Sequence, residues 1–194
     1  MRNATRILAG VLAAYCLSPR VPAEARPRTI ENGEMKYSVV LPSECRTEEG
    51  PGTLEAICAP DFDEAKSAEL PAATGLLLEV DAEAVPSDAK SYGLVEFRRD
   101  VPEAVCGESE PSKVRLSDVK EAHDGAATTF TARVTCSEIR FLGLGERQAQ
   151  VKYVILPGYR YRLMARSLSG DADKVKDAVE AFVASFKSTA EKKS

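Results

Sequence analysis

ERQAQVKYVIL-PG-YRYRLMARS, residues 146–167, decides the predicted fold. In its second half, arginines and Met164 alternate with apolar side chains, and this period of two is typical of a β-strand with one face on a core. Pro157 and Gly158 between the halves are residues that favour a tight turn. The stretch therefore predicts two antiparallel strands joined as a hairpin.

The segment before it repeats this arrangement. KVRLSDVKEAHD, residues 113–124, and ATTFTARVTCSE, residues 127–138, flank an Asp-Gly pair at Asp124 and Gly125. Asp-Gly between two strand-like runs is a strong hairpin signal. In the second run, one face would carry Phe130, Ala132, Val134 and Cys136. The second half of the chain is thus predicted to be mostly antiparallel sheet.

Two helices are expected around these hairpins. Residues 171–185 place apolar side chains at helical spacing, which predicts a helix with one apolar stripe: Val175, Ala178, Val179, Phe182, Val183 and Phe186. A second helix is expected from about residue 88 toward residue 105, capped by Ser87, with an apolar side formed by Tyr92, Leu94, Val95, Phe97 and Val101. Pro102 is expected to break or restart this helix.

The first half of the chain is expected to supply three strands, residues 34–42, 53–59 and 74–83. A turn at residues 48–52 would place Cys45 and Cys58 at corresponding ends of a hairpin, where cross-strand neighbours are close enough to be bridged. Cys106 and Cys136 would form the second disulfide. A metal site would need closer cysteine pairs or histidine partners, and a thioredoxin-type redox site would need its own motif, so disulfides are favoured.

The N-terminus indicates export. Residues 1–25 combine a basic start, an apolar run at residues 7–17 and small residues at Ala23 and Ala25, as in a cleaved signal peptide. An uncleaved anchor is the weaker alternative. No later segment has membrane length, so we expect a soluble mature chain in the periplasm, or secreted. The disulfides suit such an oxidising compartment.

We expect one domain over residues 26–187, followed by a flexible polar tail over residues 188–194. Its class would be α+β, an antiparallel sheet flanked by two helices with two disulfides. The full chain has a net charge of −4 and no Trp. An acidic chain without a basic run is a poor nucleic-acid binder, because counterion release needs clustered Lys and Arg. Nucleic acid is therefore not an expected partner.

The chain resembles a known group of proteins at the level of pattern. The strand KYSVVLP, the mid-chain helix, the run of hairpins and the closing YRLMARS and AVEAFVASFK, with Ser185-Phe186 ending a helix, resemble the PsbP-like group. That group includes the extrinsic photosystem II protein, a Ran-binding eukaryotic relative and exported bacterial proteins. The resemblance implies an αβα sandwich and a non-catalytic docking role. No motif here matches a site of the group, so no functional residue is carried over.

Two places are candidates for chemistry. His123 is the only histidine and could act as a general base, but the sequence identifies no nucleophile near it. An exposed turn histidine is the favoured interpretation. Asp61 and Asp63 could bind a hard cation such as calcium, although the EF-hand pattern is incomplete. We therefore expect no catalytic residue, no metal and no cofactor. A small hydrolase or metal-dependent enzyme using His123 or the Asp61/Asp63 loop is the alternative.

One surface is a candidate for binding. Arg160, Arg162 and Arg166 would project from one side of a strand, and Lys152 and Arg133 could join them from neighbouring strands. Guanidinium groups can hold carboxylates or phosphates in bidentate geometry. An ordinary solvated face paired with acidic side chains is the competing interpretation. The sequence thus suggests a non-enzymatic exported protein that docks to an unidentified protein or envelope component.

Overall fold

The structure is a computed structural model that describes residues 27–42, 45–58, 75–86, 91–107, 113–140, 143–167 and 172–190. The predicted signal peptide, Ser87 and the Asp61/Asp63 loop lie outside these ranges. Side chains of residues 138–145 and 172–176 are likewise not described.

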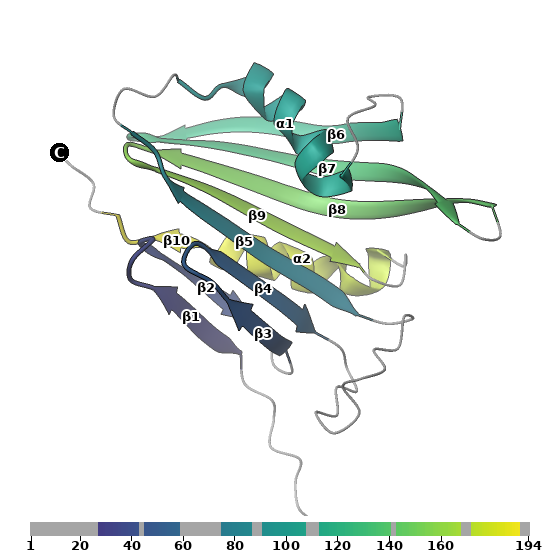
Figure 1. The fold of residues 1–194 in the computed structure, drawn as a ribbon, viewed down its shortest axis with the longest axis horizontal. Coiled ribbons are helices and arrows are strands. Elements are labelled where there is room, and N and C mark those ends of the chain that lie inside the picture. Colours follow the sequence, from purple (N-terminus) through teal and green to yellow (C-terminus); the bar gives the residue numbers. More distant parts are fainter. Residues whose placement is uncertain are drawn as a thin grey trace, which may run out of the picture.

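An antiparallel sheet of seven strands forms the centre of the molecule (Figure 1). Its spatial order is β3-β4-β5-β9-β8-β7-β6. The strands are β3 (Cys45–Glu49), β4 (Thr53–Cys58), β5 (Leu76–Ala84), β6 (Val114–Asp124), β7 (Ala127–Arg140), β8 (Gly143–Leu156) and β9 (Tyr159–Ser167). Both predicted hairpins are confirmed, and Gly125 and Gly158 occupy their turns at φ of 59° and 86°, a region that glycine adopts readily.

Helix α1 (Leu94–Cys106) and helix α2 (Ala172–Ser185) cover opposite faces of this sheet (Figure 1). Alternation along β9 separates the two cores: Tyr161 and Leu163 face α2, whereas Met164 faces α1. Phe97 of α1 stacks on Phe130 of β7 at a centroid distance of 5.4 Å. The predicted α+β sandwich is therefore confirmed.

A small three-stranded sheet lies on the α2 side. It consists of β1 (Arg28–Asn32), β2 (Tyr37–Leu41) and β10 (Lys187–Ser188), in the order β1-β2-β10. Tyr37, Val39 and Leu41 of β2 are buried in the same core as Phe182 and Phe186, as the alternation in residues 34–42 predicted. This second sheet closes the core beneath α2.

The structure corrects the predicted hairpin of the first half. Its first strand is β3, which pairs with β4 so that Cys45 lies directly opposite Cys58. The strand at residues 34–42 instead belongs to the small sheet. Ser188 pairs with Tyr37, and the N–H of Thr189 donates to Lys36 O over 2.7 Å, so order continues past the predicted domain end at residue 187.

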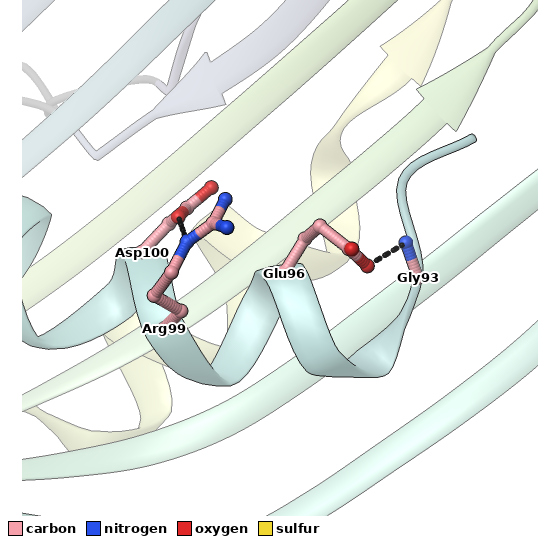
Figure 2. A network of polar contacts seen from close by, with 4 residues as sticks. All are labelled: Gly93, Glu96, Arg99 and Asp100. Carbon is pink, nitrogen blue, oxygen red and sulfur yellow. Dashed lines mark hydrogen bonds and ion pairs between the residues drawn. The ribbon is translucent and has the colours of Figure 1, made fainter. Parts of the chain in front are cut away.

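Helix α1 also differs from its prediction. It begins after Gly93, whose N–H donates to the Glu96 carboxylate over 3.0 Å, rather than near residue 88 (Figure 2). Tyr92 lies before the helix because its ring packs against Tyr153 and Phe130. Pro102 is inside the helix instead of ending it, and Val95 is 75% exposed rather than part of the apolar side. The helix ends at Gly107 in the left-handed region, with φ of 62°.

Candidate functional site

The three arginines of the predicted stripe lie on the face of β9 that looks toward the α1 side of the sheet. They share that face with Met164, which packs in the α1 core. Lys152 does not join them: it pairs with Leu163 on the opposite face, where its ammonium donates to Val183 O at the end of α2. Burial there lowers the pKa of Lys152. Arg133 also faces that opposite side, through its register with Gln150, which itself pairs with Ala165.

Two of the arginines form ion pairs in register with the neighbouring strand. Asp81 of β5 lies opposite Arg162, and Glu83 lies opposite Arg160. Their side chains form the ion pairs Arg162–Asp81 and Arg160–Glu83. The Arg160 guanidinium also stacks over the Tyr92 ring, 4.8 Å from its centroid. These guanidinium groups are already held by carboxylates, as the competing interpretation of the stripe anticipated.

The third arginine has a different setting. Arg166 is half-buried and lies in register between Leu77 and Ala149, with no carboxylate directly opposite. Its charge acts on Glu79 of β5 and favours the ionised form of that carboxyl. The three arginines therefore do not form one uniform binding surface for an anionic partner.

The ion pairs Arg160–Glu83 and Arg162–Asp81 form a ladder across β9 and β5. A cavity of about 350 Å³ opens between α1 and this ladder. Its lining includes Asp100 and Ala104 of α1, Tyr153 of β8, and both ion pairs. Asp100 accepts a hydrogen bond from the adjacent Arg99 over 2.9 Å (Figure 2). Burial and nearby Asp100 raise the pKa of Tyr153, so its phenol stays protonated at neutral pH.

A second cavity of about 370 Å³ lies next to the first and shares Asp81 and Arg162 with it. Its remaining lining comes from the β3–β4 turn and from β4 and β5: Glu48, Glu49, Gly50, Thr53, Leu54, Glu55, Glu79 and Val80. Glu48 lies opposite Glu55, and Glu55 lies opposite Glu79, so three glutamates form one row across three strands. We name this row, Glu48–Glu55–Glu79, the glutamate row.

Glu79 is the least solvated member of the glutamate row. Its Oε2 is buried and has no hydrogen-bond partner within the described part of the chain. Burial raises the pKa of Glu79, and repulsion from Glu55 adds to the rise, while Arg166 and Arg162 oppose it. A carboxyl in this condition gains from any additional cationic donor placed beside it.

His123, the histidine proposed for chemistry, does not reach this site. His123 lies at the far end of β6, where its ring contacts Thr128 Oγ1 at 3.2 Å and Glu121 Oε1 at 3.3 Å. A hydroxyl, an imidazole and a carboxylate thus adjoin, which sequence reasoning had not detected. The His123 side chain is 66% exposed, however, so water competes for each contact. Within the described ranges, no three His, Cys, Asp or Glu side chains could together hold a metal ion.

Both predicted disulfides are present, Cys45–Cys58 and Cys106–Cys136. The first closes the β3–β4 hairpin beside the glutamate row, and the second ties the end of α1 to β7. They fix the strands and the helix that border the two cavities. No helix of the described residues is long and apolar enough to cross a membrane.

The glutamate row was not predicted from the sequence. Its signal was a glutamate inside the apolar run LLLEV of β5 and another at alternating spacing in β4. Neither points to a site until the register of β3, β4 and β5 is known, because the register alone aligns the three carboxylates.

Comparisons with known proteins support the fold. No protein-family model matches the chain, and no curated protein matches it. The solution structure of cyanobacterial PsbP (CyanoP) from Synechocystis sp. PCC 6803 is similar, with a TM-score of 0.57 and 13% identity over 84% of this chain and 93% of that one. A crystal structure from Bacteroides thetaiotaomicron matches with a TM-score of 0.46 and 13% identity, over 84% of this chain and 49% of that one.

The chain therefore has a PsbP-like fold, as the sequence resemblance implied. At this level of identity the likeness concerns architecture, and fold alone does not assign a function.

Proposed function

We propose that this chain is an exported, non-catalytic accessory protein that docks to a protein or envelope component in the periplasm. The docking surface is the α1-side face of β3, β4, β5 and β9, which carries the two cavities. The observation that carries the proposal is the ladder of Arg160–Glu83 and Arg162–Asp81 flooring a cavity beside α1. Fixed, partly buried charges of both signs give a partner orientation and specificity.

Export is supported by two features. Two disulfides stabilise the domain, and such bonds persist in oxidising compartments. The first 25 residues have the pattern of a signal peptide. Expression of the full chain in a Gram-negative host, followed by fractionation, should give a periplasmic product that lacks these residues and has no free thiol. A cytoplasmic product of full length would contradict the export proposal.

Docking is tested by comparing two substitutions that add bulk without changing the charge. Thr53→Trp places a large ring in the second cavity, where Thr53 is exposed, whereas Ser117→Trp makes a similar change at an exposed position of β6 opposite Arg133. In co-purification from envelope extract, followed by identification of the captured protein, Thr53→Trp should lose a partner that Ser117→Trp keeps. Equal retention by both variants would argue against this face. Circular dichroism of both variants checks that the fold is intact.

A hydrolase that uses His123 is the second candidate. It is favoured by the contacts of the imidazole with Thr128 and Glu121, which resemble a nucleophile, base and carboxylate in order. The exposure of this trio weighs against it, since nucleophilic sites depend on groups shielded from water. Turnover of ester or peptide substrates that is abolished by both His123→Ala and Thr128→Val would establish the enzyme and displace the docking proposal.

A further inference from the structure

The glutamate row opposes like charges in register. Glu48, Glu55 and Glu79 occupy directly paired positions on β3, β4 and β5. Like charges at directly opposed positions of neighbouring strands destabilise a sheet. Within the described residues, no Lys or Arg forms an ion pair with Glu48 or Glu55. Within the described residues, Glu48 and Glu55 therefore have no counter-charge, and a cationic partner would supply one.

The cavity linings around the row contain more carboxylates than cations. The two cavities are lined by seven carboxylates, those of Glu48, Glu49, Glu55, Glu79, Asp81, Glu83 and Asp100. Their lining contains two guanidinium groups, those of Arg160 and Arg162, and both are paired with carboxylates of the same lining. The field over this part of the sheet is therefore negative and attracts cationic groups.

The face is an open sheet surface. Helix α1 packs on β6 and β7, and Figure 1 shows it displaced from β3 and β4. Glu48, Thr53 and Glu55 are exposed. Neighbouring strands are spaced by about 4.8 Å, so the outer carboxylates of the row lie roughly 10 Å apart. A partner segment has to cross the strands to meet all three carboxylates, and Lys or Arg side chains can reach that far.

Glu79 is the most buried carboxylate of the row. Its Oε2 is buried without a hydrogen-bond partner within the described residues, at the end of the row nearest Arg162. An ammonium or guanidinium group inserted there would donate to this oxygen, and charge-assisted hydrogen bonds are the stronger kind. A bare metal ion fits less well, since these carboxylates are not grouped closely enough to hold one.

We propose that the α1-side face of β3, β4 and β5 docks a basic segment of the partner protein, with its Lys or Arg side chains on Glu48, Glu55 and Glu79. This inference rests on the proposed docking function and gives the partner's charge. The arginine stripe alone would suggest an acidic partner. The partner inferred here is basic, because Arg160 and Arg162 are already neutralised within the fold.

The test uses the ¹⁵N-labelled mature chain and two synthetic peptides, one of alternating Arg and Ser and one of alternating Glu and Ser. Only the basic peptide should shift the backbone signals of Glu48, Thr53, Glu55 and Glu79, and added salt should weaken its binding. The double variant Glu48→Gln/Glu55→Gln should bind the basic peptide at least about tenfold more weakly, which corresponds to ~1.4 kcal/mol.

The matched control is Glu31→Gln/Glu34→Gln, which removes the same charge from exposed positions of the small sheet. It should bind like the wild type. Equal weakening in the control would show general charge attraction and overturn the inference. So would signals shifted by the acidic peptide alone, by neither peptide, or by calcium chloride alone.

Misfolding is separable from lost binding, because removing like charges from a row should leave unfolding by urea unchanged or raise its midpoint.

A wrong inference about the partner's charge is also separable from a failure of the docking function. If the acidic peptide binds at Arg160 and Arg162, the face still docks a partner and only its inferred charge is wrong. If the captured protein is still bound by Thr53→Trp, the docking proposal itself fails.

Discussion

The hydroxyl of Ser185, the last residue of α2, accepts a hydrogen bond from the backbone N–H of Val40 over 2.9 Å, across 145 residues of sequence. The same hydroxyl donates to Phe182 O at 2.7 Å. It thereby supplies a hydrogen-bond partner to the edge of β2 just before β10 begins at Lys187. The adjacent Phe186 ring stacks on Tyr37. The Ser-Phe pair that suggested the resemblance to the PsbP-like group thus joins α2 to the small sheet.

Ser185→Ala should therefore destabilise the protein. The substitution leaves the Val40 N–H without its acceptor in a partly buried position, which costs about 1–2 kcal/mol. Urea unfolding followed by circular dichroism measures the change. Ser117→Ala, at an exposed position of β6, is the control and should lie within about 0.5 kcal/mol of the wild type. Equal stability of both variants would show that the Ser185 bond is not needed.

Glu79 should make stability depend on pH. Burial raises the pKa of Glu79 in the folded protein above its ordinary value of 4.5, so the folded state binds the proton more readily than the unfolded chain. This contribution is fully present below pH 4.5 and is lost as the pH rises through the folded-state pKa. Glu79→Gln cannot lose this contribution, so the stability of the variant relative to wild type should grow as the pH is raised from 4.5 toward neutrality.

Urea midpoints across that pH range provide the measurement for Glu79. Glu103→Gln, on the exposed side of α1, serves as the matched control and should show no such trend. A Glu79→Gln variant whose stability relative to wild type falls with rising pH would mean that Arg166 and Arg162 outweigh burial, contrary to the structure described above.

The two disulfides should contribute in order of the loops they close. Cys45–Cys58 spans 13 positions and Cys106–Cys136 spans 30. Loop-closure entropy gives ~3 kcal/mol for the first and ~3.7 kcal/mol for the second. Paired Cys→Ala variants, compared by urea unfolding, test the order. Peptide mapping without reductant should recover the same pairs, and a peptide joining Cys45 to Cys106 would refute the assignment.

The ion pair of Arg162 and Asp81 should be energetically coupled. Both side chains are partly buried, with exposed fractions of 30% and 39%, so solvent screens their charges only in part. A double-mutant cycle with Arg162→Ala and Asp81→Ala should give about 1 kcal/mol of coupling. The pair Arg99–Asp100, with Arg99 71% exposed, should give a value near zero. Equal coupling in both cycles would show that the ion pair at the cavity floor is no stronger than an exposed one.

The hairpins and α2 were predictable because each element carries its own signal. Phe130, Ala132 and Val134 alternate along β7, and Gly125 and Gly158 supply the turns that their neighbours require. The Cys45–Cys58 pair followed from the turn predicted between them, and Cys106–Cys136 was the pair that remained. These features depend on residues close in sequence, where period and turn chemistry decide the structure.

The small sheet and the start of α1 were not predictable in this way. Strand β1 contains one large apolar residue, Ile30, and forms because β2 offers it an edge. Strand β10 has two residues and depends on the docking of α2. The helix begins after Gly93 because Tyr92 is committed to the aromatic cluster with Tyr153. In each case a tertiary contact outweighs the local signal.

For the candidate site, the sequence predicted the residues on the arginine face but not their partners. Arg160 and Arg162 alternate along β9 as expected, yet the register with β5 determines that Glu83 and Asp81 neutralise them. The same register creates the glutamate row. Strand register is a long-range property, so the sign of the surface became visible only in the fold.

The most direct test of the docking surface is site-specific photo-crosslinking in cells that produce the protein. A photoreactive amino acid replaces Thr53, exposed in the second cavity, or Glu34, exposed in the turn of the small sheet. The account predicts a discrete adduct from Thr53 that is absent from Glu34 and is lost when Glu48→Gln and Glu55→Gln are added. An adduct from Glu34 alone, or none from Thr53, would contradict it.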